Sequence, residues 1–575
     1  MGDTLNQQTI TLPQVFAGEV AKAQDAWLAN GNSRRLWSAD ATLWTGHGES
    51  DWLGWLDIAG NKARDIDATR EFARQLRREN FTDVLLLGMG GSSLGPEVLA
   101  ESLGSAPHYP KLRVLDSTDP QQVRRFESSI DIARTLFVVS SKSGTTLETS
   151  VLMDYFFAKA SSALGGAAGR HFVAITDPGS RLQKTAEEKG FRHVFSGVPS
   201  IGGRYSVLSN FGMVPLAASG HDVQAFLDAA HVMARACGPD VPPAQNPAVT
   251  LGLTIGVLAL HGRDKLTIIC SSSIASFGAW AEQLIAESTG KNGKGVIPFA
   301  GEPLGESSVY DSHRLFVFIR DQQNPDPAQE QAVDTLPRAG HPVVRVDLAS
   351  AQHLGQEFFR FEVATAVAGT VLGVNPFDQP DVEASKIATR SMTDAFERTG
   401  SLSLEPPVCT ENGIVLYTDE RNARALRSAG AKATLESWFK AHLARLDDNG
   451  YFAMLAYIDA TATRTQALQG LRAFVRDRKQ VATALQFGPR FLHSTGQAYK
   501  GGPNSGVFLE ITADPNPDLD IPGRKASFGI IEAAQARGDF RVLAERGRRV
   551  LHAHISGDVD AGLAAIVKAA LAALH

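Results

Sequence analysis

The sequence predicts an α/β protein made of two doubly wound parallel-sheet domains and an additional C-terminal α/β domain. Short apolar runs with strand character alternate along the chain with segments of helical periodicity, which is the rhythm of parallel strands joined by helices. A linker rich in Gly and Pro at 238–247 separates one such series from the next, and a third series follows residue 400. We therefore expect an N-terminal helical segment at 1–60, a first domain at 61–237, a second domain at 248–400 and a C-terminal domain at 401–575.

The N-terminal segment is rich in tryptophan, and strand–helix alternation follows it. We interpret five of the seven tryptophans as core or inter-domain anchors: Trp27, Trp37, Trp44, Trp52 and Trp55. In the first domain we expect strands at 84–87, 112–115, 137–140 and 172–176. In the second domain we expect strands at 266–270, 315–319 and 343–347, and helices at 248–260 and 358–372. Ligands of such folds bind beyond the carboxyl ends of the strands.

The C-terminal region reads as a domain of its own. We expect its strands at 414–417, 452–458, 481–486, 507–511 and 550–555. We expect its helices at 435–446, 467–476, 530–543 and 561–574.

Composition excludes several classes of partner. Of the 575 residues, 43% are hydrophobic and 21% are charged, which is ordinary for a globular protein. The net charge of −6 offers no broad basic surface to nucleic acid, and no apolar run is long enough to cross a membrane. The three cysteines are widely spaced, which predicts neither disulfides nor a zinc site. Because the first residues also lack a signal-peptide pattern, we expect a cytoplasmic protein.

The stretch after the strand at 137–140 carries the strongest functional signal. Residues 141–146 contain four hydroxyls and one lysine, and a helical pattern starts directly afterwards. The N–H groups and the positive dipole end of a helix favour an anion, and hydroxyls add donors to its oxygens. The alternative is a helix N-cap that is merely rich in Ser and Thr. No Walker sequence is present, so the pattern favours a small phosphorylated metabolite over a nucleotide.

Two glycine-rich motifs lie near this stretch. The first, Gly88 to Pro96, matches a dinucleotide fingerprint poorly because Ser93 replaces its third glycine, so we interpret it as a tight turn where backbone approaches a ligand. In the second, Gly202 and Gly203 precede Arg204, which lets backbone approach a ligand while the guanidinium faces an anion. A loop with a surface arginine explains the second motif nearly as well.

Two further segments carry polar side chains at informative positions. Gln283 and Glu287 are four residues apart, so they share one face of a helix that ends near Gly290. A carboxylate there opposes the helix dipole, which indicates either a working carboxylate or a solvated surface glutamate. Gln379 precedes a helix that begins near Pro380, and Lys386 lies two turns later on the same face. Taken alone, that segment is better explained as a capped helix with a solvated lysine.

Taken together, the motifs make the chain resemble the glucose-6-phosphate isomerase (phosphoglucose isomerase) family, which is built from two sugar-isomerase (SIS) domains. Five motifs match in order over roughly residues 80–390, namely 88–96, 140–149, 202–206, 283–294 and 377–386. The sequence around Trp44 and Gln379 is most similar to the isomerase half of fused transaldolase/glucose-6-phosphate isomerase proteins. No transaldolase segment is evident, since the opening residues lack the strand–helix series of a barrel.

The chain departs from the family pattern at two places. Asp381 stands where the family usually has glycine, and a helix N-terminus tolerates an aspartate. The family's ring-opening histidine normally lies between the glutamate and Phe-Asp-Gln motifs, where the surroundings of His313, His341 and His353 do not match. The segment 492–497, which contains His493, resembles that motif but follows the others. The resemblance therefore implies that His493 comes from the C-terminal region, while its residue type equally suits a structural loop histidine.

The resemblance implies a role for each candidate residue. Glu287 is the base that moves a proton between C1 and C2, and Arg204 stabilises the enediolate. Lys386 and His493 open the sugar ring. The implied substrate-binding residues are Gly91, Ser92, Ser141, Lys142, Ser143, Thr146, Gly203, Gln283 and Gln379.

The implied reaction is the interconversion of glucose 6-phosphate and fructose 6-phosphate in glycolysis and gluconeogenesis, without a metal or an organic cofactor. One alternative is a broader isomerase that also uses mannose 6-phosphate, and another is a phosphosugar sensor without activity. We expect a small-molecule sugar phosphate as the partner, no nucleic acid or membrane, a monomer or homodimer, and a possible functional link to a transaldolase.

Overall fold

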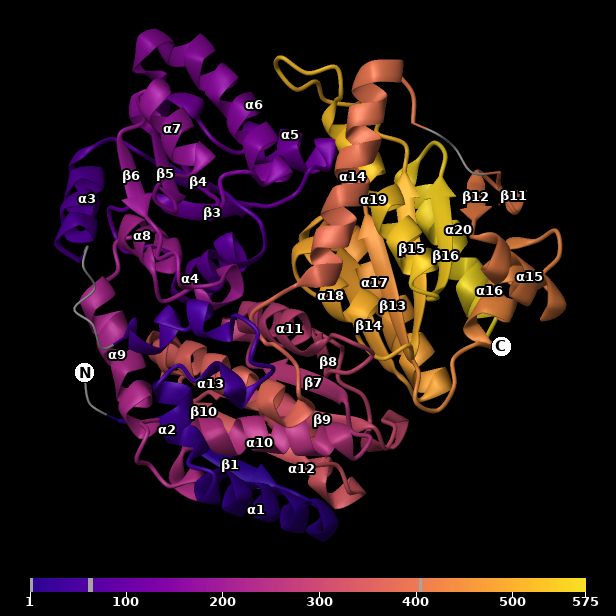
Figure 1. Cartoon of the computed structure of the whole chain (residues 1–575). Helices are drawn as coiled ribbons and strands as arrows, with labels where there is room; N and C mark the ends of the chain where they lie inside the picture. The colour runs from indigo at the N-terminus through magenta and orange to yellow at the C-terminus, as the bar shows by residue number, and fades with distance from the viewer. Residues whose placement is uncertain (1–3, 60–65, 403–405, 575) are drawn as a thin grey trace.

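The computed structural model describes residues 4–59, 66–402 and 406–574 of the chain. Outside this described part lies the predicted boundary between residues 60 and 61. Outside it, too, lie residues 1–3, which begin the stretch that we examined for a targeting signal. The described residues form three α/β units, each around its own sheet (Figure 1). The predicted fold class is therefore confirmed.

The strands form three sheets. The first sheet contains β2 (Asp83–Leu87), β3 (Lys111–Leu115), β4 (Thr135–Ser140), β5 (Phe172–Thr176) and β6 (His193–Ser196), all parallel. The second contains β7 (Lys265–Cys270), β8 (Ile297–Ala300), β9 (Arg314–Asp321) and β10 (Val343–Leu348), also parallel, and the antiparallel edge strand β1 (Gln7–Thr11). The third contains the parallel strands β13 (Tyr451–Tyr457), β14 (Ala482–Phe487), β15 (Gly506–Ala513) and β16 (Arg549–Ile555), with β12 (Ile414–Tyr417) and β11 (Cys409–Glu411) antiparallel at one edge.

The three sheets share one strand order. Their parallel strands run β3-β2-β4-β5, β8-β7-β9-β10 and β14-β13-β15-β16, so the second strand of each unit lies outside the first. The direction of winding reverses between the first and third strands, and we call this place the switch point of the sheet. The switch points lie between β2 and β4, between β7 and β9, and between β13 and β15.

Helices cover the sheets on both faces (Figure 1). Every residue of β2 and β4 is buried, as expected for parallel strands between two helical layers. Before and around the first sheet the helices are α1 (Gln14–Ala29), α2 (Asn32–Trp37), α3 (Ile66–Arg78), α4 (Leu94–Leu103), α5 (Pro120–Ser128), α6 (Leu147–Leu164), α7 (Arg181–Glu188), α8 (Asn210–Ala218) and α9 (Val223–Ala236). The second unit has α10 (Pro247–Leu260), α11 (Ser276–Thr289), α12 (Pro327–Thr335) and α13 (Leu354–Leu372). The remaining helices are α14 (Pro380–Thr399), α15 (Glu420–Ser428), α16 (Leu435–Leu443), α17 (Ala462–Lys479), α18 (Gly496–Gly501), α19 (Phe528–Glu545) and α20 (Val559–Ala572).

The N-terminal segment differs from the helical segment that we predicted. Its strand β1 pairs with the edge strand β10, whose N–H and C=O groups are otherwise left unpaired at the sheet edge. Of its tryptophans, Trp55 is fully buried and stacks on Tyr205 with 5.0 Å between the ring centroids. Trp52 is instead 37% exposed, and its ring lies 5.8 Å from Lys142 Nζ. The start of the segment is therefore part of the second unit, whereas its residues around Trp55 pack on the first unit, and Trp52 is not a core anchor.

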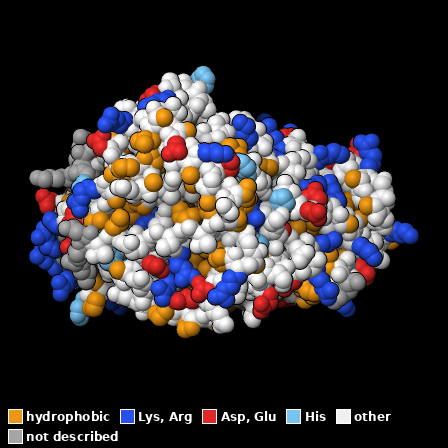
Figure 2. Space-filling view, turned by 90° about the horizontal axis from the view of Figure 1, so that it is seen from below, with side chains coloured by type: hydrophobic (Ala, Val, Ile, Leu, Met, Phe, Trp, Pro, Cys, Tyr) orange, Lys and Arg blue, Asp and Glu red, His pale blue; other side chains and the backbone are white. Residues whose placement is uncertain are grey.

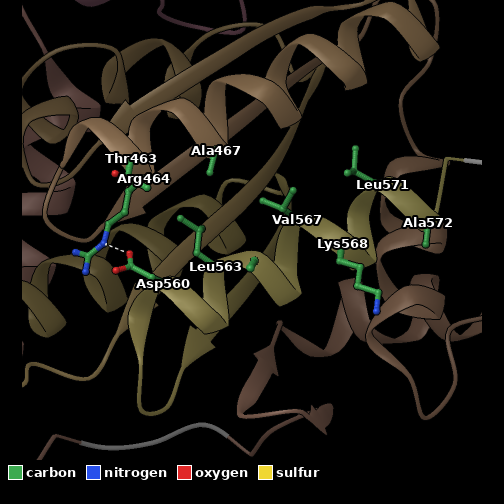
Figure 3. A pocket seen from close by; sticks show the side chains of 10 residues that line it. Thr463, Arg464, Ala467, Asp560, Leu563, Val567, Lys568, Leu571 and Ala572 are labelled. Carbon is green, nitrogen blue, oxygen red and sulfur yellow. Dashed lines mark hydrogen bonds and ion pairs between the residues drawn. The ribbon is translucent and has the colours of Figure 1, made fainter.

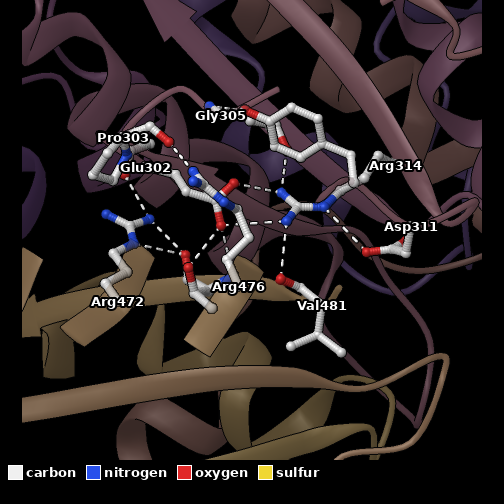
Figure 4. Close-up of polar contacts among 12 residues, drawn as sticks. Glu302, Pro303, Gly305, Asp311, Arg314, Arg472, Arg476 and Val481 are labelled. Atoms are coloured by element: carbon white, nitrogen blue, oxygen red, sulfur yellow. Dashed lines mark hydrogen bonds and ion pairs between the residues drawn. The ribbon is translucent and has the colours of Figure 1, made fainter. Parts of the chain in front are cut away.

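The C-terminal unit packs tightly on both other units. Helix α14 lies against α19, and Leu519 and Phe528 share an apolar cluster with Phe137 and Phe156 of the first unit (Figure 1). In the second unit, Arg314 Nη1 lies 2.7 Å from Glu302 Oε2, and this pair contacts the C-terminal unit (Figure 4). Arg314 Nη2 donates to the Val481 carbonyl at 3.1 Å, and Glu302 Oε1 accepts from Thr483 N at 2.9 Å. A buried ion pair holds an arrangement in place because breaking it leaves an uncompensated charge. The three units are thus held in fixed contact.

Two surface features concern possible partners. On the face shown in Figure 2, Lys and Arg side chains lie among Asp and Glu side chains, with apolar side chains between them. Within the described ranges, none of the helices has both the length and the apolar character needed to cross a lipid bilayer.

Candidate functional site

The candidate site lies at the switch point of the first sheet, where loops from all three units meet. Gly90 follows β2, and a Cβ atom placed on it would lie 2.8 Å from the His493 carbonyl oxygen and 3.0 Å from Gln283 Nε2. A Cβ on Gly91 would lie 2.0 Å from the Gly203 carbonyl oxygen. We expected these glycines to let backbone approach a ligand. The structure shows instead that Gly90 and Gly91 allow three protein segments to meet, while a Cβ on Gly203 would have no neighbour within 4 Å among the described residues.

Glu287 sits in the last turn of α11 and is 7% exposed, so it is not a solvated surface glutamate. Gln283 lies on the same helix face, and its Nε2 donates to Glu287 Oε2 at 3.1 Å. Arg204 Nη1 lies 3.2 Å from Glu287 Oε1. A buried carboxylate needs such partners, because burial without them costs several kcal/mol. The carboxylate is thus held in one position.

Arg204 is fixed on every side. Its Nε donates to Ser288 Oγ at 2.8 Å, and its Nη1 donates to Gln379 Oε1 at 2.9 Å. Its Nη2 donates to the carbonyls of Pro376 and Asp378 at 2.6 and 2.9 Å. With the Glu287 contact, all five N–H groups of the guanidinium are used. The cation is therefore not a surface arginine, and it brings Gln379 to Glu287.

His493 reaches this site from the C-terminal unit. It lies in a 3₁₀ segment after β14, and its Nε2 is 2.8 Å from Glu148 Oε1 in the first turn of α6. Its carbonyl oxygen accepts a hydrogen bond from Gln283 Nε2 at 2.8 Å, the same nitrogen that donates to Glu287. His313, by contrast, is half-buried away from the site, and its Nδ1 bonds to the Gly262 carbonyl. The histidine that joins the site is thus the one that follows the other motifs in the chain.

An arginine anchors the His493 segment to the first unit. Arg490 Nη1 and Nη2 each donate to a Glu97 carboxylate oxygen at 2.6 Å, and Arg490 Nε lies 2.8 Å from Asp116 Oδ2. A bidentate arginine–carboxylate pair sets both position and orientation. Burial raises the pKa of Glu97, and the guanidinium opposes that rise.

Asp381, the departure from the family pattern, bonds to the C-terminal unit. Its Oδ1 lies 2.8 Å from Arg546, and its Oδ2 accepts from Gln497 Nε2 at 2.8 Å. Gln497 Oε1 in turn accepts from the N–H groups of Asp381 and Val382 at the start of α14. The unusual aspartate therefore connects α14 with the additional domain.

The phosphate loop that we predicted precedes α6. Ser141 Oγ and Thr146 Oγ1 are 3.1 Å apart, and Ser143 Oγ and Thr145 Oγ1 are 2.9 Å apart. A cavity of about 270 Å³ between α6 and α7 reaches Ser141 and Thr146. Lys142 does not face this cavity freely, since its Nζ pairs with Asp177 and donates to the Pro199 carbonyl. The hydroxyls and the helix start are thus together, with the lysine charge already compensated.

The remaining predicted residues lie around this core. Ser92 is buried in the 3₁₀ turn that follows β2. Lys386 is half-exposed on α14, with Nζ 3.4 Å from Glu383 Oε2, and its charge acts on the Glu148 carboxylate. The structure therefore brings Glu287, Arg204, Gln283, Gln379 and His493 into direct contact, while Lys386 stands apart.

The sequence reasoning missed two residues of the site. Glu148 lies within the recognised 140–149 motif but has no distinguishing pattern. Burial alone would raise the pKa of Glu148, yet the adjacent His493 imidazole holds it below its usual value. Lys291 follows Glu287 closely and lies 2.7 Å from Asp378 Oδ1. Burial lowers the pKa of Lys291 to about 7, with the nearby Arg204 charge adding to this effect. Its place after Gly290 in the 283–294 motif was the available signal.

A cavity of larger volume lies elsewhere. It is a mostly apolar groove of about 590 Å³ between α17 and α20, lined by Leu563, Val567 and Leu571, with the Arg464–Asp560 pair at one end (Figure 3). Among the described residues, no cluster of three or more His, Cys, Asp or Glu side chains is arranged to hold a metal ion. The chemistry of the site therefore has to be read from the groups around Glu287.

Comparisons with known proteins identify the family of this chain. Residues 72–301 match the family model described as phosphoglucose isomerase. The chain is 31% identical over 377 residues to a glucose-6-phosphate isomerase from Rubrobacter xylanophilus, covering 56% of this chain and 85% of the relative. It is 28% identical over 428 residues to one from Parabacteroides distasonis, covering 66% and 92%. A crystal structure of a hypothetical protein from Thermus thermophilus is similar, with a TM-score of 0.57 and 25% identity over 67% of this chain and 99% of that one. The finer likeness to fused transaldolase proteins stays a prediction.

Proposed function

Because this chain belongs to the glucose-6-phosphate isomerase family and is an isomerase enzyme, we propose that it interconverts glucose 6-phosphate and fructose 6-phosphate through an enediolate. The observation that carries the proposal is the convergence of Glu287, Arg204 and His493. They come from two main units and from the C-terminal unit, yet they are linked by direct hydrogen bonds and one ion pair.

Glu287 takes the proton from one carbon and returns it to the next. The carboxylate is held by Gln283 and Arg204, so it keeps one orientation towards both carbons. Arg204 places a fixed positive charge beside the carbon atoms where the enediolate charge develops. A preorganised charge in a site of low dielectric lowers the barrier without reorganisation during the reaction. Open space at Gly203 leaves room for the sugar beside this pair.

His493 is the acid/base group of ring opening. Its Nε2 is bonded to Glu148, and among the residues that the structure describes none bonds to Nδ1. Nδ1 is therefore the nitrogen that meets the ring oxygen or the anomeric hydroxyl. The Glu148 carboxylate stabilises the imidazolium that forms when His493 takes a proton. Lys386 lies on the Glu148 side and is the second group assigned to this step.

The phosphate group binds at the start of α6. Ser141, Ser143 and Thr146 supply hydroxyls, and the helix start supplies N–H groups and a positive dipole end. Lys142 contributes a positive charge that Asp177 partly compensates. We propose that the reaction needs no metal, since a carboxylate base and a guanidinium account for the proton transfer and the developing charge.

The test follows the formation of glucose 6-phosphate from fructose 6-phosphate with a coupled dehydrogenase, with and without EDTA. We expect turnover that EDTA leaves unchanged, and a loss of at least about 100-fold in kcat for Glu287→Gln, because a positioned base contributes that much. Glu282→Gln is a matched control, because Glu282 is a buried glutamate on the same helix, α11. Glu282 accepts hydrogen bonds from Ala300 N and Gln486 Nε2 and does not bond to Glu287, so its replacement should leave kcat close to that of wild type.

Three outcomes would contradict parts of the proposal. Turnover retained in Glu287→Gln would remove that residue as the base. Saturable binding of fructose 6-phosphate by a wild type without turnover would indicate a sensor. Activity lost with EDTA, once an effect on the coupling enzyme is excluded, would reveal a metal. Parallel assays with mannose 6-phosphate measure how broadly the enzyme accepts sugar phosphates.

A further inference from the structure

We propose that Gln535, on helix α19 of the C-terminal unit, is a positioning residue that holds Glu148 in place for His493 during ring opening. The inference rests on the proposed function, because it assigns a task within that reaction. Gln535 lies far from every recognised motif in the sequence. It does not touch the position of the reacting carbons, so any effect must pass through Glu148.

Two side chains of the C-terminal unit contact the same oxygen of the Glu148 carboxylate. Glu148 Oε1 lies 2.8 Å from His493 Nε2 and accepts a hydrogen bond from Gln535 Nε2 at 2.6 Å. Glu148 is 4% exposed and Gln535 is 1% exposed. In a buried site a carboxylate keeps its charge and its orientation only through such donors. Gln535 therefore supplies the contact that remains when His493 turns or exchanges its proton with the substrate.

The orientation of the Gln535 amide is itself determined. Its Oε1 accepts from Thr118 Oγ1 at 2.6 Å, so its N–H₂ group must face Glu148. Thr118 is fully buried just beyond the carboxyl end of β3. The chain of contacts runs from Thr118 to Gln535, to Glu148 and to His493, and it crosses between the first and C-terminal units at each step. A terminal amide with one end fixed presents its donor at one place, which is what an orienting group requires.

Docking of the C-terminal unit thus has two consequences for the site. It delivers His493, which Arg490 anchors through Glu97 and Asp116. Through Gln535 it also prepares the partner that His493 needs on the first unit. The Glu287–Arg204 pair does not depend on this chain of contacts, because Arg204 is held by Ser288, Gln379 and the carbonyls of Pro376 and Asp378. Loss of Gln535 should therefore impair ring opening and leave the C1–C2 proton transfer intact.

The experiment separates these two steps with two substrates. Fructose 6-phosphate must be opened, whereas 5-deoxyfructose 6-phosphate lacks the hydroxyl that closes the furanose ring and enters in open form. Proton transfer on either compound is followed by the incorporation of deuterium from solvent at C1. Gln535→Met keeps the length and the apolar volume of the side chain but removes the donor, which limits the effect on folding.

We expect Gln535→Met to lower the kcat for fructose 6-phosphate by about 10- to 100-fold, a part of what acid/base catalysis contributes. The rate with 5-deoxyfructose 6-phosphate should stay within about twofold of wild type, because Glu287 is untouched. Thr118→Val, which releases the amide, should give the same selective loss at about three- to tenfold. Gln121→Met removes two other inter-unit hydrogen bonds, one to the Asn516 carbonyl and one from Arg464 Nη1, and should slow neither substrate.

Each alternative result has a distinct meaning. Equal slowing of both substrates by Gln535→Met would assign Gln535 a general structural role and overturn the inference. Unchanged rates with both substrates in Gln535→Met and Thr118→Val would also overturn it, while leaving the isomerase assignment intact. A wild type that exchanges deuterium into neither compound would overturn the proposed function, and this inference with it.

Discussion

At the switch point of the first sheet, the loop after β4 presents the Ser141 and Thr146 hydroxyls, which bond to each other. At the equivalent place in the second sheet, Ser273 donates to the carboxylate of Asp321 at 2.7 Å, and Gln323 N and Asn324 Nδ2 donate to it as well. Asp321 is fully buried. The protein's own carboxylate thus occupies the kind of place that we assign to a phosphate in the first sheet.

The switch point of the third sheet is closed in another way. The N-terminus of α5 from the first unit covers it, and the remaining cavity beside Asp119, Asp459 and Glu532 measures about 10 Å³. That is room for about one water molecule. Three sheets with one strand order therefore have three different switch points. The strand order thus sets where a site can lie, whereas a few side chains determine whether a ligand can bind there.

The largest expected effect comes from making the first switch point resemble the second. Ser141→Asp places a carboxylate at the start of α6, where it accepts hydrogen bonds from the helix N–H groups and repels a phosphate dianion. We expect the KM for fructose 6-phosphate to rise by about 100-fold or more, measured with the coupled assay. Ser162→Asp, on the exposed side of the same helix, is the control and should leave KM unchanged. An unchanged KM in Ser141→Asp would place the phosphate elsewhere.

The second switch point should matter for stability and not for binding. Asp321→Ala leaves the Ser273 hydroxyl, the Asn324 amide and the Gln323 N–H without their acceptor. We expect a loss of about 2–4 kcal/mol in the free energy of unfolding, since buried donors without partners are costly. Urea denaturation measures this loss, and the KM for fructose 6-phosphate should stay within about twofold of wild type. A raised KM at unchanged stability would show that the second switch point contributes to the substrate site.

The third switch point should respond to pH. Burial raises the pKa of Asp119 from 3.8 to about 6, and the Asp459 charge adds to the rise. Folding then takes up a proton between these values, so wild type loses this contribution to stability as pH rises through that window. We expect Asp119→Asn to be more stable than wild type by about 1–2 kcal/mol at pH 7.5 and equal to it at pH 4.

Thermal unfolding at both pH values measures this difference. Asp131→Asn serves as the control, because Asp131 accepts a backbone hydrogen bond from Ala133 at an exposed helix start. A stability difference that is the same at both pH values would contradict a raised pKa of Asp119.

The smallest effect concerns the compensated lysine of the first switch point. Asp177→Asn removes the carboxylate that pairs with Lys142, so the positive charge of Lys142 can attract the phosphate without competition. We expect the KM for fructose 6-phosphate to fall by about two- to threefold at low ionic strength, and this gain to shrink at 0.5 M salt. A KM that rises would show that Asp177 positions Lys142 instead of competing for it.

The sequence by itself determined the α/β class and most strands of the three units, together with some of their helices. Fully apolar runs such as Val84–Leu87 and Phe137–Val139 have few alternatives to a buried parallel strand, and the structure places β2 and β4 there. Local spacing also placed Gln283 and Glu287 on one helix face, because the α-helical repeat alone sets that relation. The hydroxyl-rich stretch at 141–146 predicted a helix start for the same reason, since the preference acts within one turn.

Only the tertiary structure decided which distant residues meet. Nothing local in the sequence relates His493 or Gln535 to Glu148, because their contacts span more than 340 residues and depend on how the C-terminal unit docks. The same holds for β1, which joins the second sheet through an edge that only the folded unit presents. It also holds for Lys142, whose partner Asp177 follows a neighbouring strand. Periodicity and capping act over a few residues, whereas packing between units sets the partners of a buried charge, and these partners determine what the charge can do.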